Sequence, residues 1–186
     1  MPRSLLLKVF IHEDLKDYKM QDLREQFDWV VAEIEEISGR RMTLSFVPPS
    51  EAPGISDFNY IHSDAPYVLY AYSREIDAYK DSSDYKYDDN LHKFLLLTRH
   101  NINSSTSGIA APSGTYAIAS INYRAPAHEV GHMFDARHED YEVLYDGWWN
   151  ETIMAPGTGF SPLRGNANRF SDKNRENIRQ YLEQFD

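Results

Sequence analysis

The hydrophobic positions of the N-terminal half form short apolar runs that flank one long helical pattern. Residues 4–12 are a nearly continuous apolar run, which is typical of a buried strand. Over residues 20–38 the apolar positions recur every three or four residues, so we expect a long amphipathic helix that ends at Gly39. Residues 41–47 return to an apolar run and stop at two prolines, which indicates another strand.

The central part of the chain predicts more strands, separated by polar turns. Residues 66–72 and 93–99 are rich in aromatic and aliphatic side chains, and we expect a strand in each. The acidic segment 81–90 is expected to be a solvated loop; calcium (Ca2+) stays open there, although the segment lacks spaced aspartates with a turn glycine. Residues 107–123 indicate two short strands around a Pro-Ser-Gly turn, with small side chains that leave a strand edge open to another chain.

The C-terminal third predicts two helices around a loop. One helix follows Pro126, whereas residues 141–170 are dominated by glycine, proline, asparagine and aromatics without a sustained period, which indicates loop. A last helix starts at the N-cap Ser171 and presents one apolar side, made of Ile178, Tyr181, Leu182 and Phe185. Since no repeat or linker separates these elements, the pattern favours one α/β domain.

Composition narrows the classes of function. The chain has 186 residues, 41% of them hydrophobic, which suits a single domain with one core. Its formal charge of −10 argues against non-specific binding to nucleic acid or anionic lipid, because both need a basic face. The longest apolar runs fall short of the roughly 20 residues that span a bilayer, and the run at 4–12 is too short for a signal peptide. The lack of cysteine excludes disulfides, thiolate catalysis and cysteine zinc sites.

Three histidines lie within the stretch HEVGHMFDARHED, residues 128–140. His128 and His132 are four residues apart, so on a helix both imidazoles lie on one face and reach one zinc ion. If the helix continued, His138 would lie about 9 Å further along the axis and about 240° round from His132, facing away from that ion. The helix must therefore end between the second and the third histidine if all three are to bind one metal.

Asp135 is the residue at which we expect the chain to turn. Ending a helix within one residue usually requires a left-handed backbone conformation, which aspartate adopts more readily than most residues with a Cβ. Its short side chain can bond neighbouring amides and so offset the cost of that conformation. The hypothesis is that Asp135 turns the chain so that His138 comes back onto the metal.

Glu129 is the candidate catalytic base. It follows His128 directly and projects from the helix beside the metal without being needed as a ligand. Its carboxylate can take a proton from water whose pKa zinc lowers toward neutrality. Three protein ligands leave one coordination position open, which distinguishes catalytic zinc from structural zinc.

The motif HEVGHMFDARH resembles that of the metzincin zinc metallopeptidases, H-E-x-x-H-x-x-G-x-x-H followed by a methionine turn. The turn would be TIMAPG, and the resemblance implies that Met154 lies beneath the metal as a hydrophobic base. Pro156 and the form HEVGHMF are similar to the reprolysin-like enzymes, the adamalysin and ADAMTS groups. The chain departs from their pattern at Asp135, where the motif has glycine, and lacks the disulfides of animal reprolysins.

The resemblance implies a zincin/metzincin-like α/β fold, with residues 1–186 as one catalytic domain. An upper subdomain, about 1–137, would hold a twisted mixed β-sheet and two long helices above a cleft. A small, loop-rich lower subdomain, about 138–186, would end in the C-terminal helix. The segments SGIAAPSG and FSDKNRENIRQYL fall where reprolysins have the substrate-lining strand and the last helix.

The resemblance further implies a secreted, monomeric zinc-dependent endopeptidase, with Zn2+ as cofactor and a protein or peptide as partner. An extended peptide would pair with the edge strand near Ile109 and Ala110, and residues 155–164 would form the wall of the adjoining pocket. Glu129 would accept the water proton and pass it to the leaving amine. Two other functions stay open: a zinc hydrolase of another amide, such as cell-wall peptide, and a zinc-stabilised binding domain with vestigial activity.

Several residues have a plainer interpretation. The aromatics after the motif are expected to close a small core rather than to line the cleft: Tyr141, Tyr145, Trp148 and Trp149. Glu139 and Asp140 either orient the site or are solvated, and neither alternative is favoured. The other four histidines have no partners at ligand spacing and fit ordinary hydrogen-bonded or surface residues: His12, His62, His92 and His100.

Overall fold

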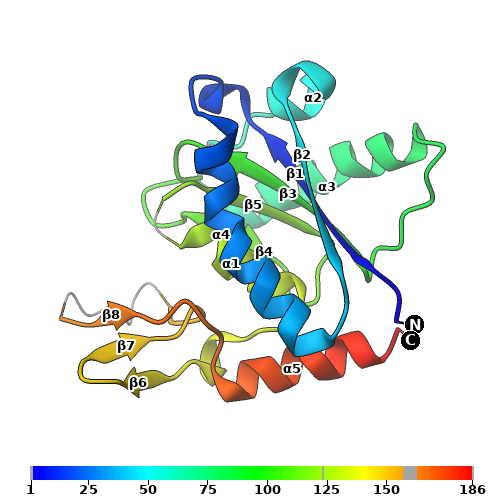
Figure 1. Cartoon of the computed structure of the whole chain (residues 1–186). Coiled ribbons are helices and arrows are strands. Elements are labelled where there is room, and N and C mark those ends of the chain that lie inside the picture. Colours follow the sequence, from blue (N-terminus) through cyan, green and yellow to red (C-terminus); the bar gives the residue numbers. More distant parts are fainter. Residues whose placement is uncertain (1, 123, 157–162, 186) are drawn as a thin grey trace.

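The main sheet runs through the middle of the molecule in the computed structural model, which describes residues 2–122, 124–156 and 163–185 (Figure 1). Its strand order is β2-β1-β3-β5-β4, and every neighbouring pair is parallel except β4 and β5. The strands are β1 Leu5–Ile11, β2 Met42–Val47, β3 His92–Thr98, β4 Gly108–Ala110 and β5 Tyr116–Ser120. The expected mixed sheet is therefore confirmed, with the short β4 at one edge.

Helices cover both faces of this sheet because successive strand residues point to opposite sides. One core lies between the sheet and α1 Met20–Ser38, α4 Ala125–Met133 and α5 Asp172–Glu183. The other core lies between the sheet and α2 Pro53–Ser56 and α3 Ala65–Asp81. Neighbouring residues of β3 illustrate the division, since Leu95 belongs to the first core and Phe94 to the second. Short 3-10 helices occur at η1 Glu13–Leu15, η2 Pro49–Glu51 and η3 His138–Asp140.

The segment 66–72, expected to be a strand, is instead part of helix α3. Asp64 caps this helix, since its carboxylate accepts a hydrogen bond from Tyr67 N at 3.0 Å. Buried side chains then recur at four-residue spacing, namely Val68, Tyr72 and Ile76. The strand prediction was wrong because the tyrosine-rich composition masked a helical period that becomes visible only over a longer window.

Residues 141–170, expected to be loop, contain a small second sheet. Its strands are β6 Val143–Tyr145, β7 Trp149–Glu151 and β8 Gly165–Asn166, with β6 antiparallel and β8 parallel to β7. Gly147 in the β6–β7 turn has a φ of 106°, a conformation that favours glycine. The loop prediction was wrong here because strands of two or three residues are too short to display a period.

The aromatic residues of this lower part do not close a core. Tyr145, Trp148 and Trp149 have exposed fractions of 67%, 58% and 53%, and the rings of Tyr145 and Trp149 lie 4.9 Å apart. Tyr141, by contrast, packs against the main core. The prediction of a buried aromatic cluster was therefore wrong for three of the four residues, because an isolated hairpin of three-residue strands covers too little surface to bury indole rings.

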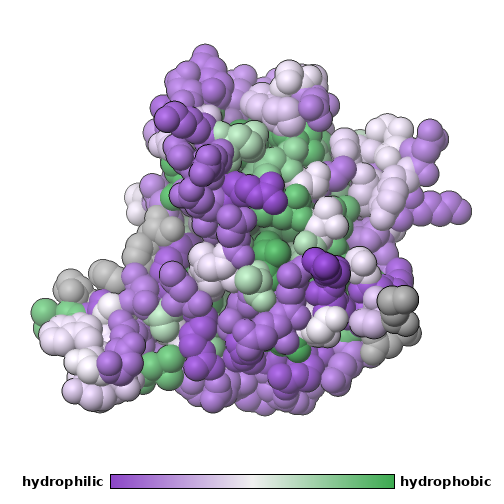
Figure 2. All heavy atoms as spheres, viewed as in Figure 1, coloured by the Kyte–Doolittle hydropathy of each residue, from purple (hydrophilic) through white to green (hydrophobic). Residues whose placement is uncertain are grey.

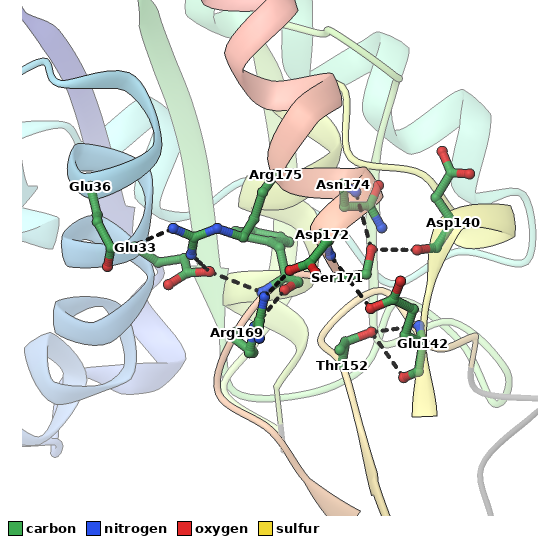
Figure 3. A network of polar contacts seen from close by, with 11 residues as sticks. Glu33, Glu36, Asp140, Glu142, Thr152, Arg169, Ser171, Asp172, Asn174 and Arg175 are labelled. Carbon is green, nitrogen blue, oxygen red and sulfur yellow. Dashed lines mark hydrogen bonds and ion pairs between the residues drawn. The ribbon is translucent and has the colours of Figure 1, made fainter. Parts of the chain in front are cut away.

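Polar contacts tie the lower part and α5 to α1 in the absence of disulfides (Figure 3). Arg175 of α5 bridges Glu33 and Glu36 of α1, with nitrogen to oxygen distances of 2.5 and 2.7 Å. Ser171 caps the start of α5 and donates its hydroxyl hydrogen to the carbonyl of Asp140. The segment that follows the third histidine is thereby attached to a helix that α1 holds in place.

The surface over α1 and α5 is largely hydrophilic, with hydrophobic atoms gathered between α1 and β2 (Figure 2). Several apolar side chains are half-buried against the core: Trp29, Val31, Leu44 and Phe46. Within the ranges that the structure describes, no helix has the length and apolarity needed to cross a membrane.

Lys93 of β3 is fully buried in the first core. Its Nζ donates to Tyr181 Oη at 3.0 Å and to the carbonyl of Asp89 at 3.2 Å, and it lies 5.3 Å from the centre of the Phe134 ring. Burial lowers the pKa of Lys93 from 10.5 to about 7. Between these two pH values the unfolded chain binds more protons than the folded chain, so the stability contributed by this group should rise with pH across that window.

Replacing Lys93 with methionine should raise the free energy of unfolding near pH 6 by about 1–4 kcal/mol, because an apolar side chain of similar length replaces a buried charge. The variant should also show a smaller rise in stability between about pH 7 and pH 10.5. Urea unfolding followed by tryptophan fluorescence measures both effects, with the exposed Lys173→Met as control. A clearly lower free energy of unfolding for Lys93→Met near pH 6 would contradict this account.

Candidate metal centre

The end of α4 brings the three histidines of the motif together. His128 and His132 lie on this helix, which ends at Met133, and His138 returns to them at the start of η3. His138 Nε2 is 2.8 Å from His128 Nε2 and 3.0 Å from His132 Nε2. Ligand nitrogens around one tetrahedral zinc are about 3.3 Å apart, so a small outward movement of the rings would accommodate the ion. This donor set and spacing suit zinc.

The turn after α4 is made at Asp135, which has a φ of 71°. Its carboxylate accepts a hydrogen bond from Ser113 Oγ at 3.1 Å and another from Arg137 Nη2 at 2.9 Å. The partners are thus a hydroxyl and a guanidinium, whereas the sequence led us to expect neighbouring amides. Ser113 also has a positive φ, 55°, and its N–H donates to the carbonyl of His132 at 2.8 Å. Two strained turns therefore stabilise each other, which a glycine at position 135 could not achieve through a side chain.

Backbone carbonyls fix the orientation of two of the imidazoles. His128 Nδ1 donates to the carbonyl of Ile153 at 3.0 Å, and His132 Nδ1 donates to that of Ala136 at 3.0 Å. Since a carbonyl only accepts, each ring carries its proton on Nδ1 and presents a lone pair at Nε2. Burial lowers the pKa of His128 to about 3 and that of His132 to about 4, so both rings are neutral near pH 7. Neutral imidazole is the form that binds metal.

Asn174 of α5 holds the backbone next to His138. This side chain is fully buried; Arg137 N donates to its Oδ1 at 2.6 Å, and its Nδ2 donates to the carbonyl of Arg137 at 3.0 Å. The two bonds fix both backbone polar groups of the residue that precedes the third histidine. The sequence motif does not indicate this contact, because Asn174 lies 37 positions beyond Arg137.

Replacing Asn174 with alanine should weaken zinc binding by about 10–100-fold, because the backbone that positions His138 loses both side-chain bonds. The affinity can be measured by competition with a chromophoric chelator. Gln180→Ala, at an exposed position of the same helix, serves as the control and should bind zinc like the native chain. A folded Asn174→Ala variant with native zinc affinity would show that Asn174 does not position His138.

The side chain of Glu129 extends from α4 to the edge strand β4. Its exposed fraction is 5%, and burial raises the pKa of its carboxyl to about 8, although a hydrogen bond from Ala110 N opposes this shift. Gly108 provides the space for the side chain, since a Cβ at that position would lie 2.7 Å from Glu129 Cγ and 2.8 Å from Oε1. The carboxyl group is therefore held against the strand edge that faces the histidines.

The described part of the methionine turn, residues 152–156, packs against the underside of α4. Met154 is fully buried, and a Cβ at Gly131 would lie 2.7 Å from Met154 Sδ, so helix and turn are in close contact. Ile153 of the same turn supplies the carbonyl that orients His128. The turn thus contributes an apolar support and one oriented acceptor to the histidine cluster.

The three histidines and Glu129 line an open cavity of about 610 Å³. Ile109 and Ala110 of β4 line it on one side, and Ala155 and Pro156 line it after the methionine turn. Residues 157–162, which belong to the expected pocket wall, lie outside the described residues. The cavity therefore combines the edge strand, the candidate ligands and the start of that wall.

Two charged residues that the sequence analysis missed also line this cavity: Arg124 and Glu151. Arg124 donates to the backbone carbonyls of Glu151, at 3.2 Å, and of Ala167. The buried carboxylate of Glu151 accepts a hydrogen bond from Arg164 at 3.0 Å. Arg164 does not line the cavity itself and is connected to it through this ion pair. Tertiary packing alone brings these residues together, and no local pattern in the sequence signals it.

No protein-family model and no curated protein sequence matches the chain. Its structure is similar to metalloproteinase-II from Bacteroides fragilis, with TM-score 0.64 and 18% identity over 97% of this chain and 53% of that chain. It is also similar to archaemetzincin from Methanopyrus kandleri, with TM-score 0.54 and 17% identity over 98% and 99% of the two chains. The chain shares the fold of these two proteins.

A further similar structure is a zinc-dependent peptidase from Methanocorpusculum labreanum, with TM-score 0.50 and 17% identity over 92% of this chain and 99% of that chain. The chain spans about half the length of the Bacteroides protein and nearly the whole length of the two archaeal ones. These likenesses support the zinc-peptidase fold and do not single out the reprolysin branch, to which the motif is similar.

Glu139, Asp140 and the acidic segment 81–90 are not part of the histidine cluster. Glu139 is exposed, whereas the Asp140 carboxylate accepts a hydrogen bond from Asn177 at 2.7 Å. In the acidic segment 81–90, Asp88 pairs with Arg3 and Asp89 with Lys80, both at 2.6 Å. Among the described residues, side chains that could bind a metal converge in one group of three, which consists of His128, His132 and His138.

Proposed function

We propose that this chain is a zinc-dependent endopeptidase that cleaves extended peptides in the cavity beside β4. The observation that carries the proposal is the convergence of three imidazole nitrogens, with His138 Nε2 at 2.8 and 3.0 Å from those of His128 and His132, beside the buried carboxyl group of Glu129. Two of the similar structures, a metalloproteinase and a zinc-dependent peptidase by name, support the same activity. His128, His132 and His138 would hold the zinc, and Glu129 would act on the attacking water.

Each part of the cavity has a role in this proposal. Zinc, when bound, supplies a Lewis acid that polarises the scissile carbonyl and makes water more acidic. Glu129 accepts the proton of the attacking water and passes it to the nitrogen of the leaving amine. Burial raises the pKa of its carboxyl from the ordinary value toward neutrality, which suits a group that has to take up a proton and then release it. The open edge of β4 near Ile109 and Ala110 pairs with the backbone of the peptide.

We further propose that the enzyme is of the metzincin type, with an upper part of about residues 1–137 and a lower part of about 138–186. The close packing of Met154 below Gly131 supports a methionine turn in this position. Pro156 lines the cavity, in keeping with the similarity to reprolysins, and would contact the substrate side chain after the scissile bond. The Asp135 turn takes the place of the motif glycine.

Incubation with a mixed peptide library, with and without a zinc chelator, tests the proposed function. We expect internal cleavage of peptides that stops on chelation and returns when zinc is added. If the protein cleaved a bacterial cell-wall peptide but none of the library peptides, the result would favour the alternative of a zinc hydrolase that acts on another amide. Zinc binding without any hydrolysis would favour a binding domain with vestigial activity and would contradict the proposal.

A further inference from the structure

A second pocket lies on the side of the sheet that faces α3, away from the histidine cluster. There α3 covers Phe10 of β1 and Phe94 of β3. Two positions earlier on the same face of these strands, Lys8 and His92 are only half-buried. An open pocket of about 620 Å³ occupies this uncovered part of the sheet, beneath the segment 85–88. This volume suits a small ligand.

Lys8 lies in this pocket without an acidic partner. Its Nζ donates to Tyr79 Oη and to Tyr87 Oη, both at 3.0 Å, and among the described residues no carboxylate forms an ion pair with it. Burial opposes the charge, yet the two phenol groups outweigh this effect and raise the pKa of Lys8. Burial likewise opposes ionisation of Tyr87, but the contact with Lys8 prevails and lowers the pKa of Tyr87. The site therefore favours negative charge.

The other charged groups of the pocket leave a local excess of cations. Arg3 and Asp88 form an ion pair at 2.6 Å and cancel each other. Burial lowers the pKa of His92, which is therefore neutral near pH 7. Lys86 is exposed at the rim and adds a second positive charge to that of Lys8. The whole chain carries a formal charge of −10, so this pocket is a locally positive site on an acidic protein and would attract an anion.

The walls offer hydroxyl groups and aromatic rings to a ligand. Ser45 and Thr43 of β2 line one side. On the other side Tyr85 is 56% exposed, and its ring lies 4.7 Å from that of Tyr87 and 5.7 Å from that of His92. An exposed ring backed by two others can take the flat apolar body of a ligand. The pocket thus presents positive charge and hydroxyls beside an aromatic surface.

We propose that this pocket binds a small organic anion, with an anionic oxygen group at Lys8 and Lys86 and a planar body against Tyr85. The hydroxyl groups of Ser45 and Thr43 complete the hydrogen bonding of the anion. Since the pocket lies on the face of the sheet opposite α4, the proposal does not depend on the proposed peptidase activity.

Titration of the full chain with phenyl phosphate, followed by amide NMR shifts, tests this site. We expect saturable shifts in 5–8, 43–45 and 85–92, weaker binding of inorganic phosphate, and no saturation with phenol. Lys8→Met should weaken phenyl phosphate binding by about tenfold or more, and Lys86→Met by about threefold, because each removes a charged partner of the anion. Benzoate in a parallel titration decides whether phosphate or carboxylate is the preferred group.

Lys173→Met, at an exposed position of α5, is the matched control and should bind phenyl phosphate like the native chain. Lys86→Met keeps the test decisive if Lys8→Met fails to fold, since the side chain of Lys86 is exposed. Three results would overturn the proposal: no saturable shifts in the native chain, native affinity in both lysine variants, or equal loss in the Lys173→Met control. Phenol binding as tightly as phenyl phosphate would overturn the role of the anion.

Discussion

Replacing Glu129 with glutamine should abolish most peptide hydrolysis while leaving the fold and zinc binding intact. Glutamine keeps an oxygen that can accept the hydrogen bond from Ala110 N, so the variant removes the base with little change in shape. Loss of a positioned general base costs about 100- to 10,000-fold in rate. The measurement is kcat/KM on a peptide from the library, together with the zinc content of the purified variant.

Glu25→Gln, an exposed change on α1, is the control and should retain native activity. The assignment of Glu129 would be wrong if Glu129→Gln retained more than a few per cent of native kcat/KM. A variant that lost zinc together with activity would indicate instead that Glu129 supports the ligands. The pair of readouts therefore separates a base from a structural residue.

Replacing Gly108 with alanine should reduce kcat by about 100-fold, because a small displacement of a catalytic group can cost that much. The new Cβ would lie 2.7 Å from Glu129 Cγ and 2.8 Å from Oε1, so one of the two must move. A glutamate side chain moves more easily than the backbone of a strand, and we expect Glu129 to leave its position. Activity should fall much more than the free energy of unfolding, and zinc binding should stay native.

Gly54→Ala is the matched control for this prediction. Gly54 lies in α2, where an added Cβ meets nothing within 4 Å, so the same chemical change should leave kcat and zinc affinity native. Native kcat in Gly108→Ala would show that the fit between β4 and Glu129 does not matter for catalysis. A rise in KM with native kcat would place Gly108 in substrate binding rather than in the positioning of Glu129.

The histidine cluster could be predicted from the sequence because its spacing is local. His128 and His132 are one helical turn apart, and the position of His138 required a break in the helix near Asp135. The break is present, with a φ of 71° at Asp135. Its side-chain partner Ser113, however, is 22 positions away, and no short-range rule connects the two residues.

The errors in the fold have an equally local cause. Segment 66–72 has the composition of a strand, and only the continuation of its apolar spacing through α3 identifies a helix. The strands β6, β7 and β8 are too short to show a period, and their stability depends on contacts with the rest of the molecule. Asn174, Arg124 and Glu151 belong to the site through packing between distant segments, which a single sequence does not display.

The central claim is that three imidazoles of this chain hold one zinc ion with a position left open. A crystal structure of the zinc-loaded protein tests it most directly. We predict one zinc ion bound by the Nε2 atoms of His128, His132 and His138 at about 2.0–2.1 Å, next to the carboxyl group of Glu129. Zinc bound elsewhere, or a His138 ring turned away from the ion, would contradict the account.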